Sequence, residues 1–273
     1  MRVHFLSVGR ADCTLVELPD GKIMLIDGGS SDASCAESVK RAFSSLRIKK
    51  IDYLVVGFES ESRIGGLERV LESVEIGKAF LPCRADLSLG ETYRSLVSAV
   101  LEKAANVCYA VRGDRAEGEN YRALFLSPRS RAVQSQGRSA LLSAVLRLEY
   151  AGVGFLFCGD ATAEVLDGLR LDYLLDPEAF GAPVDFSSNP IVKIASHGAE
   201  GSTSEEFLSF LGWEVAVLSC AAGDPTAPAG ETAANLRLSN EEGRVYRTDE
   251  CGNVMITVSA DGKYTVSNEN GIK

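Results

Sequence analysis

Few side chains in this sequence can act as imidazole bases or as nitrogen ligands for a metal. The 273 residues include two histidines, His4 and His197, and seven cysteines. The cysteines are odd in number, none forms a Cys-x-x-Cys pair, and several, such as Cys158, lie in apolar runs. We therefore expect reduced cysteines in the core rather than a disulfide framework or a thiolate metal site.

The other candidates for chemistry are polar residues that follow short apolar segments. Segment 54–57 precedes the run Phe58-Glu59-Ser60-Glu61-Ser62-Arg63, and segment 155–158 precedes Gly159-Asp160. Segment 191–195 precedes Ser196-His197-Gly198. Apolar runs of this length, bounded by glycine and polar residues, are typical of strands. We therefore place these side chains on loops at strand ends.

The remaining segments alternate between strand and helix patterns. Turn residues around 19–21 and 151–152 predict two hairpins. Helices are predicted over 34–46, 64–74, 93–104, 163–171, 204–211 and 231–238, and the least regular stretches are 112–121, 127–138 and 221–230. Two β-rich halves, each followed by helices, indicate an α/β sandwich of two sheets with helices outside. The rival is one doubly wound sheet, which the hairpins disfavour because parallel neighbours need crossovers.

Composition excludes several classes of protein. Apolar residues make up 45% of the chain and charged residues 24%, which is typical of a packed globular protein. The net charge of −10 argues against a protein that grips a nucleic-acid backbone, because such proteins present a basic face. No apolar run reaches the roughly 18 residues of a membrane span, and the first five residues do not form a signal peptide. We expect a cytoplasmic protein with one domain over residues 1–273.

The opening segment VHFLSVGRADCTL (3–15) resembles the metallo-β-lactamase superfamily, and most closely the soluble hydrolase-like domain of the ComEC competence DNA-uptake proteins. Matching segments follow in the same order to the last strands: ELPDGK (17–22), LIDGG (25–29), IGGL (64–67), GD (159–160), HG (197–198), GSTSEEF (201–207) and YRTDE (246–250). The resemblance implies an α/β fold, a four-layer αβ/βα sandwich of two mixed β-sheets flanked by helices. It places the functional site at one rim, between the sheets.

The resemblance also implies a pair of metal ions, commonly zinc, which would lower the pKa of a bridging water to about 7. The family holds these ions with an HxDxDH motif after segment 54–57. In this sequence the four ligand positions of the motif are occupied by Phe58, Ser60, Ser62 and Arg63. Arg63 is permanently protonated, so it brings a positive charge to the place where the family has a cation.

The rest of the implied ligand set is partly retained. Ser196 and Ala227 stand where the family has histidine, whereas Asp160 and His197 match family ligands. The resemblance assigns His4 to the first strand and not to the site. One usable imidazole cannot hold a dinuclear centre, which takes about four or five. We therefore predict no zinc pair and no other cofactor.

We weighed a catalytic or ligand-binding role for the retained residues against a structural one. For Asp160 we favour an ion pair with Arg63 over metal ligation. For His197 we favour a structural role, with a Ser–His nucleophile built from Ser60, Ser62 or Ser196 as the alternative.

Other polar residues near the implied rim carry weaker expectations. Glu59 and Glu61 could bind a hard cation together with Asp160, but we expect them to be solvated. Asp12, Thr14 and Asp27 are expected to order the loops.

Three functions remain open. The first is an inactive homologue with a binding or regulatory role. The second is a metal-dependent hydrolase of the phosphodiesterase or nuclease type, with a reorganised site and Asp160, His197 and Ser62 as catalytic candidates. The third is a pocket that binds a small anionic ligand through Arg63, with Asp160, His197, Ser196 and Ser60 around it. We expect a small anion or a protein as partner, and neither nucleic acid nor a membrane.

Overall fold

The strands of the protein form two mixed sheets. The computed structural model describes residues 1–82, 90–130, 139–188 and 190–272. The first sheet contains β1 (Arg2–Phe5), β2 (Thr14–Glu17), β3 (Ile23–Ile26), β4 (Lys50–Val55), β5 (Glu75–Leu81), β6 (Ala104–Tyr109), β14 (Val254–Val258) and β15 (Tyr264–Asn268). The second contains β7 (Arg115–Glu117), β8 (Tyr121–Ser127), β9 (Val145–Tyr150), β10 (Val153–Phe157), β11 (Ile191–Lys193), β12 (Val215–Leu218) and β13 (Arg244–Arg247).

Both sheets change from antiparallel to parallel pairing along their width. The first has the order β15-β14-β1-β2-β3-β4-β5-β6 and becomes parallel from β3 onward. The second has the order β13-β12-β11-β10-β9-β8-β7 and is parallel from β10 to β13. The single doubly wound sheet that we kept as a rival is therefore wrong.

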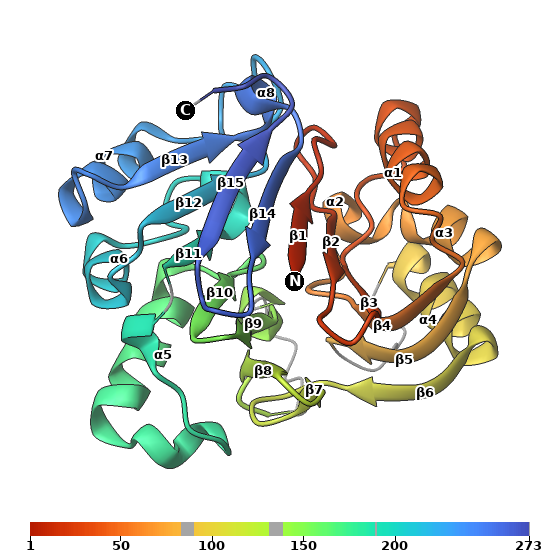
Figure 1. Cartoon of the computed structure of the whole chain (residues 1–273), viewed down its shortest axis with the longest axis horizontal. Helices are drawn as coiled ribbons and strands as arrows, with labels where there is room; N and C mark the ends of the chain where they lie inside the picture. The colour runs from red at the N-terminus through yellow and green to blue at the C-terminus, as the bar shows by residue number, and fades with distance from the viewer. Residues whose placement is uncertain (83–89, 131–138, 189, 273) are drawn as a thin grey trace.

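Helices cover the outer face of each sheet, which completes the four predicted layers (Figure 1). The helices beside the first sheet are α1 (Ala33–Ser45), α2 (Glu61–Ile64), α3 (Leu67–Ser73) and α4 (Glu91–Lys103). Those beside the second are α5 (Ala163–Leu175), α6 (Glu205–Leu211) and α7 (Gly230–Ser239), and α8 (Thr248–Cys251) connects β13 to β14. Among the described helices, none has the length and apolar character that a membrane span requires.

The core between the sheets holds the fold together. It includes Phe5 of β1 and Phe157 of β10, whose ring centroids lie 6.1 Å apart. Every residue of β10 is buried, as expected of a strand covered on both faces. Two further apolar clusters fill the spaces between each sheet and its helices. The sheets are thereby fixed relative to one another, and so are the loops at their ends.

The two predicted hairpins are confirmed. β2 pairs with β3 across the turn at residues 19–21, and β9 pairs with β10 across Ala151 and Gly152. Ala151 and Gly152 have φ values of 52° and 78°, which suit the left-handed turns that match the twist of a hairpin.

The predicted helix over 64–74 is interrupted, because α2 ends at Ile64 and α3 begins at Leu67. At the break, backbone groups bond outside the helix: the amide of Gly66 donates to the carbonyl of Gly29 at 3.0 Å, and the carbonyl of Ser62 accepts the amide of Asp12 at 2.9 Å. A β-carbon at position 66 would lie 2.2 Å from the carbonyl oxygen of Gly28, so this close approach requires glycine. The stretch 112–121, predicted to be irregular, contains the short edge strand β7, and part of the stretch 127–138 lies outside the described residues.

The topology brings several strand ends to one edge of the molecule. β3 and β4 are parallel neighbours, and so are β10 and β11. The carboxyl ends of parallel strands lie at the same edge of a sheet, so the loops that follow these four strands can meet. We call this edge the rim.

The inter-sheet core should dominate stability. Leu148 of β9 is fully buried between the sheets, whereas Leu174 of α5 is 58% exposed. We predict that Leu148→Ala lowers the free energy of unfolding by about 2–5 kcal/mol, because it leaves a cavity. The same change at Leu174 should stay within about 0.5 kcal/mol. Chemical denaturation of the two variants checks this, and equal losses would contradict the assigned core.

Candidate functional site

Backbone hydrogen bonds tie three loops of the first half together at the rim. The amide of Asp12 donates to the carbonyl of Ser62 at 2.9 Å, and the amide of Gly29 donates to the carbonyl of Asp12 at 2.8 Å. The amide of Gly28 donates to the carbonyl of Arg63, also at 2.8 Å. The loops after β1, β3 and β4 therefore hold one another, and together they fix the start of α2.

Arg63 lies at the centre of this arrangement. Its side chain is 2% exposed, and its Nη1 donates to Oδ2 of Asp27. Its Nη2 lies 2.5 Å from Oδ2 of Asp12 and 2.7 Å from Oδ1 of Asp160. The predicted ion pair with Asp160 is thus confirmed. The guanidinium also binds Asp12 and Asp27, and it connects loops of both sheets.

Lys193, the last residue of β11, adds a second cation. Its Nζ lies 2.7 Å from Oδ1 of Asp12, and its side chain is 5% exposed. We call Arg63, Lys193, Asp12, Asp27 and Asp160 the Arg63 cluster. Three carboxylates thus face two fixed cations in a nearly dry environment, where unpaired charges would be very costly.

Burial and the two cations act in opposite directions on the carboxyl groups of the cluster. Burial favours the neutral form of Asp12, but the charges of Arg63 and Lys193 outweigh it and hold its pKa well below the usual range. Arg63 lowers the pKa of Asp160 in the same way. At Asp27 burial prevails over the nearby Arg63, and with help from the charge of Asp12 it raises the pKa to about 6.

His197 lies in a tight turn, η4 (Ala195–Gly198), after β11, and its φ of 60° is in the left-handed region. Its Nδ1 lies 3.1 Å from the carbonyl oxygen of Ser219, which can only accept, so Nδ1 carries the proton. Burial lowers the pKa of His197, because the charged form would be poorly solvated. The ring is therefore neutral at pH 7, and in the part of the chain that the structure describes no hydrogen bond uses the lone pair of its Nε2.

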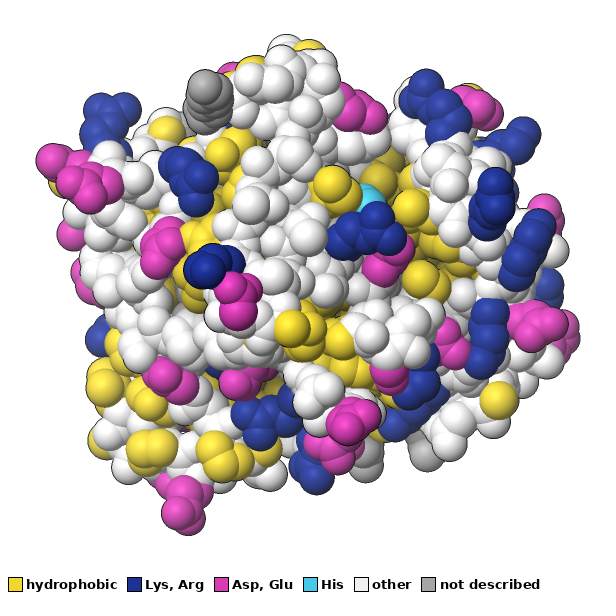
Figure 2. Space-filling model, in the orientation of Figure 1, with side chains coloured by type: hydrophobic (Ala, Val, Ile, Leu, Met, Phe, Trp, Pro, Cys, Tyr) yellow, Lys and Arg dark blue, Asp and Glu magenta, His cyan; other side chains and the backbone are white. Residues whose placement is uncertain are grey.

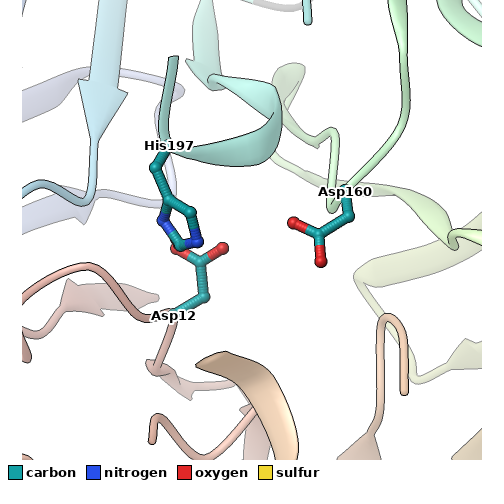
Figure 3. Close-up of side chains that lie close together, drawn as sticks. All are labelled: Asp12, Asp160 and His197. Atoms are coloured by element: carbon teal, nitrogen blue, oxygen red, sulfur yellow. The ribbon is translucent and has the colours of Figure 1, made fainter. Parts of the chain in front are cut away.

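Asp12, Asp160 and His197 converge from three loops (Figure 3). One ligand atom from each lies within 4.8 Å of the others, so the three could surround a metal ion. Two of the three ligands, however, are already bound to cations: both Asp12 and Asp160 contact Arg63, and Asp12 also contacts Lys193. The cavity beside Arg63 has a volume of about 20 Å³, which is space for about one water molecule.

The other positions of the family's metal motif supply few ligands. Phe58 and Ala227 have no donor atom in their side chains, and Ala227 is buried. The hydroxyl of Ser60 donates to Oδ2 of Asp160 at 2.8 Å and lies 3.2 Å from the hydroxyl of Ser62. These two serines extend the hydrogen-bond network of Asp160.

The structure does not favour the Ser–His alternative. His197 directs Nδ1 to a backbone carbonyl, and in the described part of the chain no hydrogen bond joins it to Ser60, Ser62 or Ser196. Ser196 is half-buried and donates its amide to the carbonyl of Gly159 at 2.9 Å.

The acidic residues of the loop after β4 take different positions. Oε1 of Glu61 accepts the amide of Ser31 at 2.8 Å, so this side chain supports the loop before α1. Glu59 is half-buried, and burial raises the pKa of its carboxyl. Neither belongs to the three residues whose ligand atoms converge among the described residues, so the hard-cation site of Glu59, Glu61 and Asp160 is not formed.

Sequence reasoning assigned Asp12 and Asp27 to loop ordering and did not single out Lys193. A signal for Lys193 was present, because a lysine in the apolar segment 191–195 is tolerated in a core only when it is paired. The ion pairs of Asp12 and Asp27 with Arg63 form only when three loops meet in the folded protein. No local sequence pattern predicts this meeting.

Comparison with known proteins finds relatives in sequence and in fold. No family model matches the chain. ComE operon protein 3 of Bacillus subtilis (strain 168) is 24% identical over 267 residues, which are 92% of this chain and 32% of that protein. The chain therefore spans about a third of the length of this relative.

Solved structures resemble the protein over nearly its whole length. The metallo-β-lactamase fold protein YhfI of Bacillus subtilis has a TM-score of 0.55 at 8% identity, covering 98% of this chain and 100% of that one. A diphosphatase from the PhnP family (TM-score 0.50, 10% identity) and Igni18, a metallo hydrolase of Ignicoccus hospitalis (TM-score 0.50, 14% identity), have the same coverage. The protein has the metallo-β-lactamase fold and is similar in sequence to ComE operon protein 3, as the resemblance in its motifs predicted.

Proposed function

We propose that this protein is a catalytically inactive relative of the metallo-β-lactamase-fold hydrolases, in which Arg63 replaces the metal pair, and that it acts by binding or regulation. One observation carries the proposal: a single buried guanidinium contacts Asp12, Asp27 and Asp160 at the rim. A positive charge that cannot be removed therefore lies among the acidic ligands that a metal would need.

The side chains at the rim do not fit a zinc pair. Such a centre takes about four or five imidazoles, and His197 is the one histidine of the chain at this edge. The two carboxylates nearest to it are neutralised by Arg63 and Lys193. Two divalent ions at this place would lie beside two fixed cations in a medium that screens charge poorly.

A single-metal hydrolase is the second candidate, favoured by the convergence of Asp12, Asp160 and His197. The neighbours with this fold include proteins described as a metallo hydrolase and a diphosphatase. A metal at this place would first have to displace the guanidinium from Asp12 and Asp160, and would leave Arg63 buried with Asp27 as its remaining carboxylate partner. That cost makes the inactive state the better proposal.

The same contacts weigh against the anion pocket expected around Arg63. Both terminal nitrogens of the guanidinium already bind carboxylates, so an anion would meet Asp12, Asp27 and Asp160 before it met a free donor. We therefore place any binding function away from Arg63.

Metal analysis tests the proposal directly. We predict that the purified protein holds far less than one equivalent of zinc, iron or manganese by elemental mass spectrometry. Added zinc or manganese should give no cleavage of bis(4-nitrophenyl) phosphate. Near-stoichiometric metal together with metal-dependent cleavage would establish the hydrolase instead. The variant Phe58→His/Ser60→Asp/Ser62→Asp/Arg63→His, with Ser196→His and Ala227→His, is the positive control and should retain more zinc than the wild type.

Removal of the guanidinium should destabilise the fold. We predict that Arg63→Ala lowers the free energy of unfolding by about 3–5 kcal/mol at pH 7, because it leaves three buried carboxylates with one cation. Arg2→Ala is the matched control, since Arg2 pairs with Glu17 at a half-exposed site, and should cost at most about 1 kcal/mol. Equal losses in the two variants would show that Arg63 is not the counter-charge of the rim.

The loss of unfolding free energy caused by Arg63→Ala should also depend on pH. In the wild type Arg63 lowers the pKa of Asp160, which contributes stability above the ordinary pKa that is lost as pH falls. In the wild type burial already raises the pKa of Asp27 to about 6, so some stability is lost as pH rises toward that value. In the variant, without Arg63, burial should raise the carboxyl pKa values further, so its stability should fall more steeply than that of the wild type over the same rise in pH. The effect at Asp160 and the steeper fall in the variant both make the difference between the proteins larger at pH 7 than at pH 4. Denaturation curves across this range check the sign, and a constant difference would contradict it.

A further inference from the structure

We propose that the groove between α1 and α3 binds a small amphipathic anion, with an aliphatic or aromatic body and a carboxylate or phosphate head. This α1/α3 groove has a cavity volume of about 720 Å³, compared with about 20 Å³ beside Arg63. Its size is within the roughly 300–1,000 Å³ of typical small-molecule sites. The proposal stands independently of whether the rim is catalytic.

The groove arises from the way in which the helices pack. α3 packs closely on α4, whereas α1 has few contacts with α3 and stands apart from it on the outer face of the first sheet (Figure 1). The chain leaves α1 through Leu46 and turns back toward β4. A furrow is left between the two helices, and Gly28 and Gly66 also line it.

The floor of the groove is apolar. Val39 and Phe43 are four residues apart on α1 and therefore lie on the same face of the helix. Val70 of α3 and Ile48 complete the floor. These four side chains retain 5–8% exposure, whereas many core residues of the same cluster have none. An apolar body of a ligand would remove this remaining surface from water.

The edges of the groove are positively charged. Lys40, Arg47, Lys49 and Arg69 line it, and Glu37 is the one acidic residue among the lining side chains. Within the described residues none of the four cations forms an ion pair, and Arg69 only donates to the carbonyl of Ser31 at 3.3 Å. Figure 2 shows Lys and Arg side chains gathered along the edge of the molecule where α1 and α3 lie. In a protein of net charge −10, this is a local concentration of unpaired positive charge.

Arg47 has an unusual backbone conformation. Its φ is 55°, and the amide of Ile48 donates to the carbonyl of Phe43 at 2.9 Å. These are the features of a helix end whose left-handed residue is usually glycine, because a side chain there is strained. An arginine at this position carries a conformational cost, and it is one of the residues that line the groove. Strain of this kind is often found at functional positions.

Together, the floor and the edges favour one class of ligand. A neutral apolar molecule would leave the cations unused, and a simple phosphate would leave the floor exposed. An extended nucleic acid is disfavoured because Glu68 and Glu72 lie exposed on α3 beside the groove. A small molecule with an apolar body and one anionic head matches both surfaces.

Isothermal titration with decanoate tests the proposal. We expect saturable binding at one site, weakened by added salt because the cations are exposed. Decan-1-ol and acetate, which each keep one half of the probe, should bind at least about tenfold more weakly. Absence of saturable decanoate binding, or equal binding of decan-1-ol, would overturn the proposal.

Matched variants locate the site. Lys40→Ala should weaken decanoate binding about three- to tenfold, whereas Arg41→Ala, its neighbour on α1 outside the groove, should leave it unchanged. Ser44→Trp should fill the groove and abolish binding, and Ser45→Trp is its control. If the variants of each pair bind equally, decanoate binds elsewhere and the proposal fails.

Arg47→Gly separates a functional role from a structural one. Glycine accepts the left-handed backbone, so the variant should have an unchanged or higher melting temperature while it binds decanoate about three- to tenfold more weakly. Wild-type affinity in this variant would exclude Arg47 from the site and remove the argument drawn from its strain.

Discussion

The architecture of the rim depends on the contacts of one guanidinium with three carboxylates. Asp12, Asp27 and Asp160 come from three loops that are distant in sequence, and burial alone would keep each of them neutral. Arg63 allows these groups to approach one another, because its planar fork presents two terminal nitrogens in fixed directions. The two sheets are thus joined at this edge by ion pairs, and elsewhere by their shared apolar core.

A fold built around metal ions can lose them only if something else balances the acidic ligands. In our proposal a guanidinium does so, and Lys193 adds a second charge through Asp12. Arg63 and Lys193 carry two positive charges, where a pair of divalent ions would carry four. A guanidinium has no open coordination position and does not activate a water molecule, but it joins three loops through its contacts with Asp12, Asp27 and Asp160. Such an exchange retains the stability of the scaffold and leaves it available for binding.

The fold and the Arg63–Asp160 ion pair could be predicted from the sequence, because each depends on short motifs of neighbouring residues. Hairpin turns, apolar segments and motif order predicted two sheets with helices outside, and the exchange at Arg63 predicted its ion pair with Asp160. The split between α2 and α3 could not be predicted, since backbone groups at the break form hydrogen bonds with Gly29 and Asp12 on two other loops. Loop ordering by Asp12 and Asp27 was predicted, and their backbone contacts confirm it. Their ion pairs with Arg63 and the pairing of Lys193 with Asp12 were missed, because each requires a neighbour brought by tertiary structure.

The rim and the α1/α3 groove share a wall, and this links them physically. Gly28 and Gly66 line the groove, while the amide of Gly28 donates to the carbonyl of Arg63 and the amide of Gly66 donates to that of Gly29. The loop that carries Arg63 is therefore hydrogen-bonded to backbone that an occupant of the groove would contact. Backbone that is already ordered before the ligand binds lowers the entropic cost of binding. By thermodynamic linkage, a ligand in the groove would in turn stabilise the loops of the rim. In our proposal, a rim without a metal pair would still contribute to binding, because its loops support the neighbouring groove.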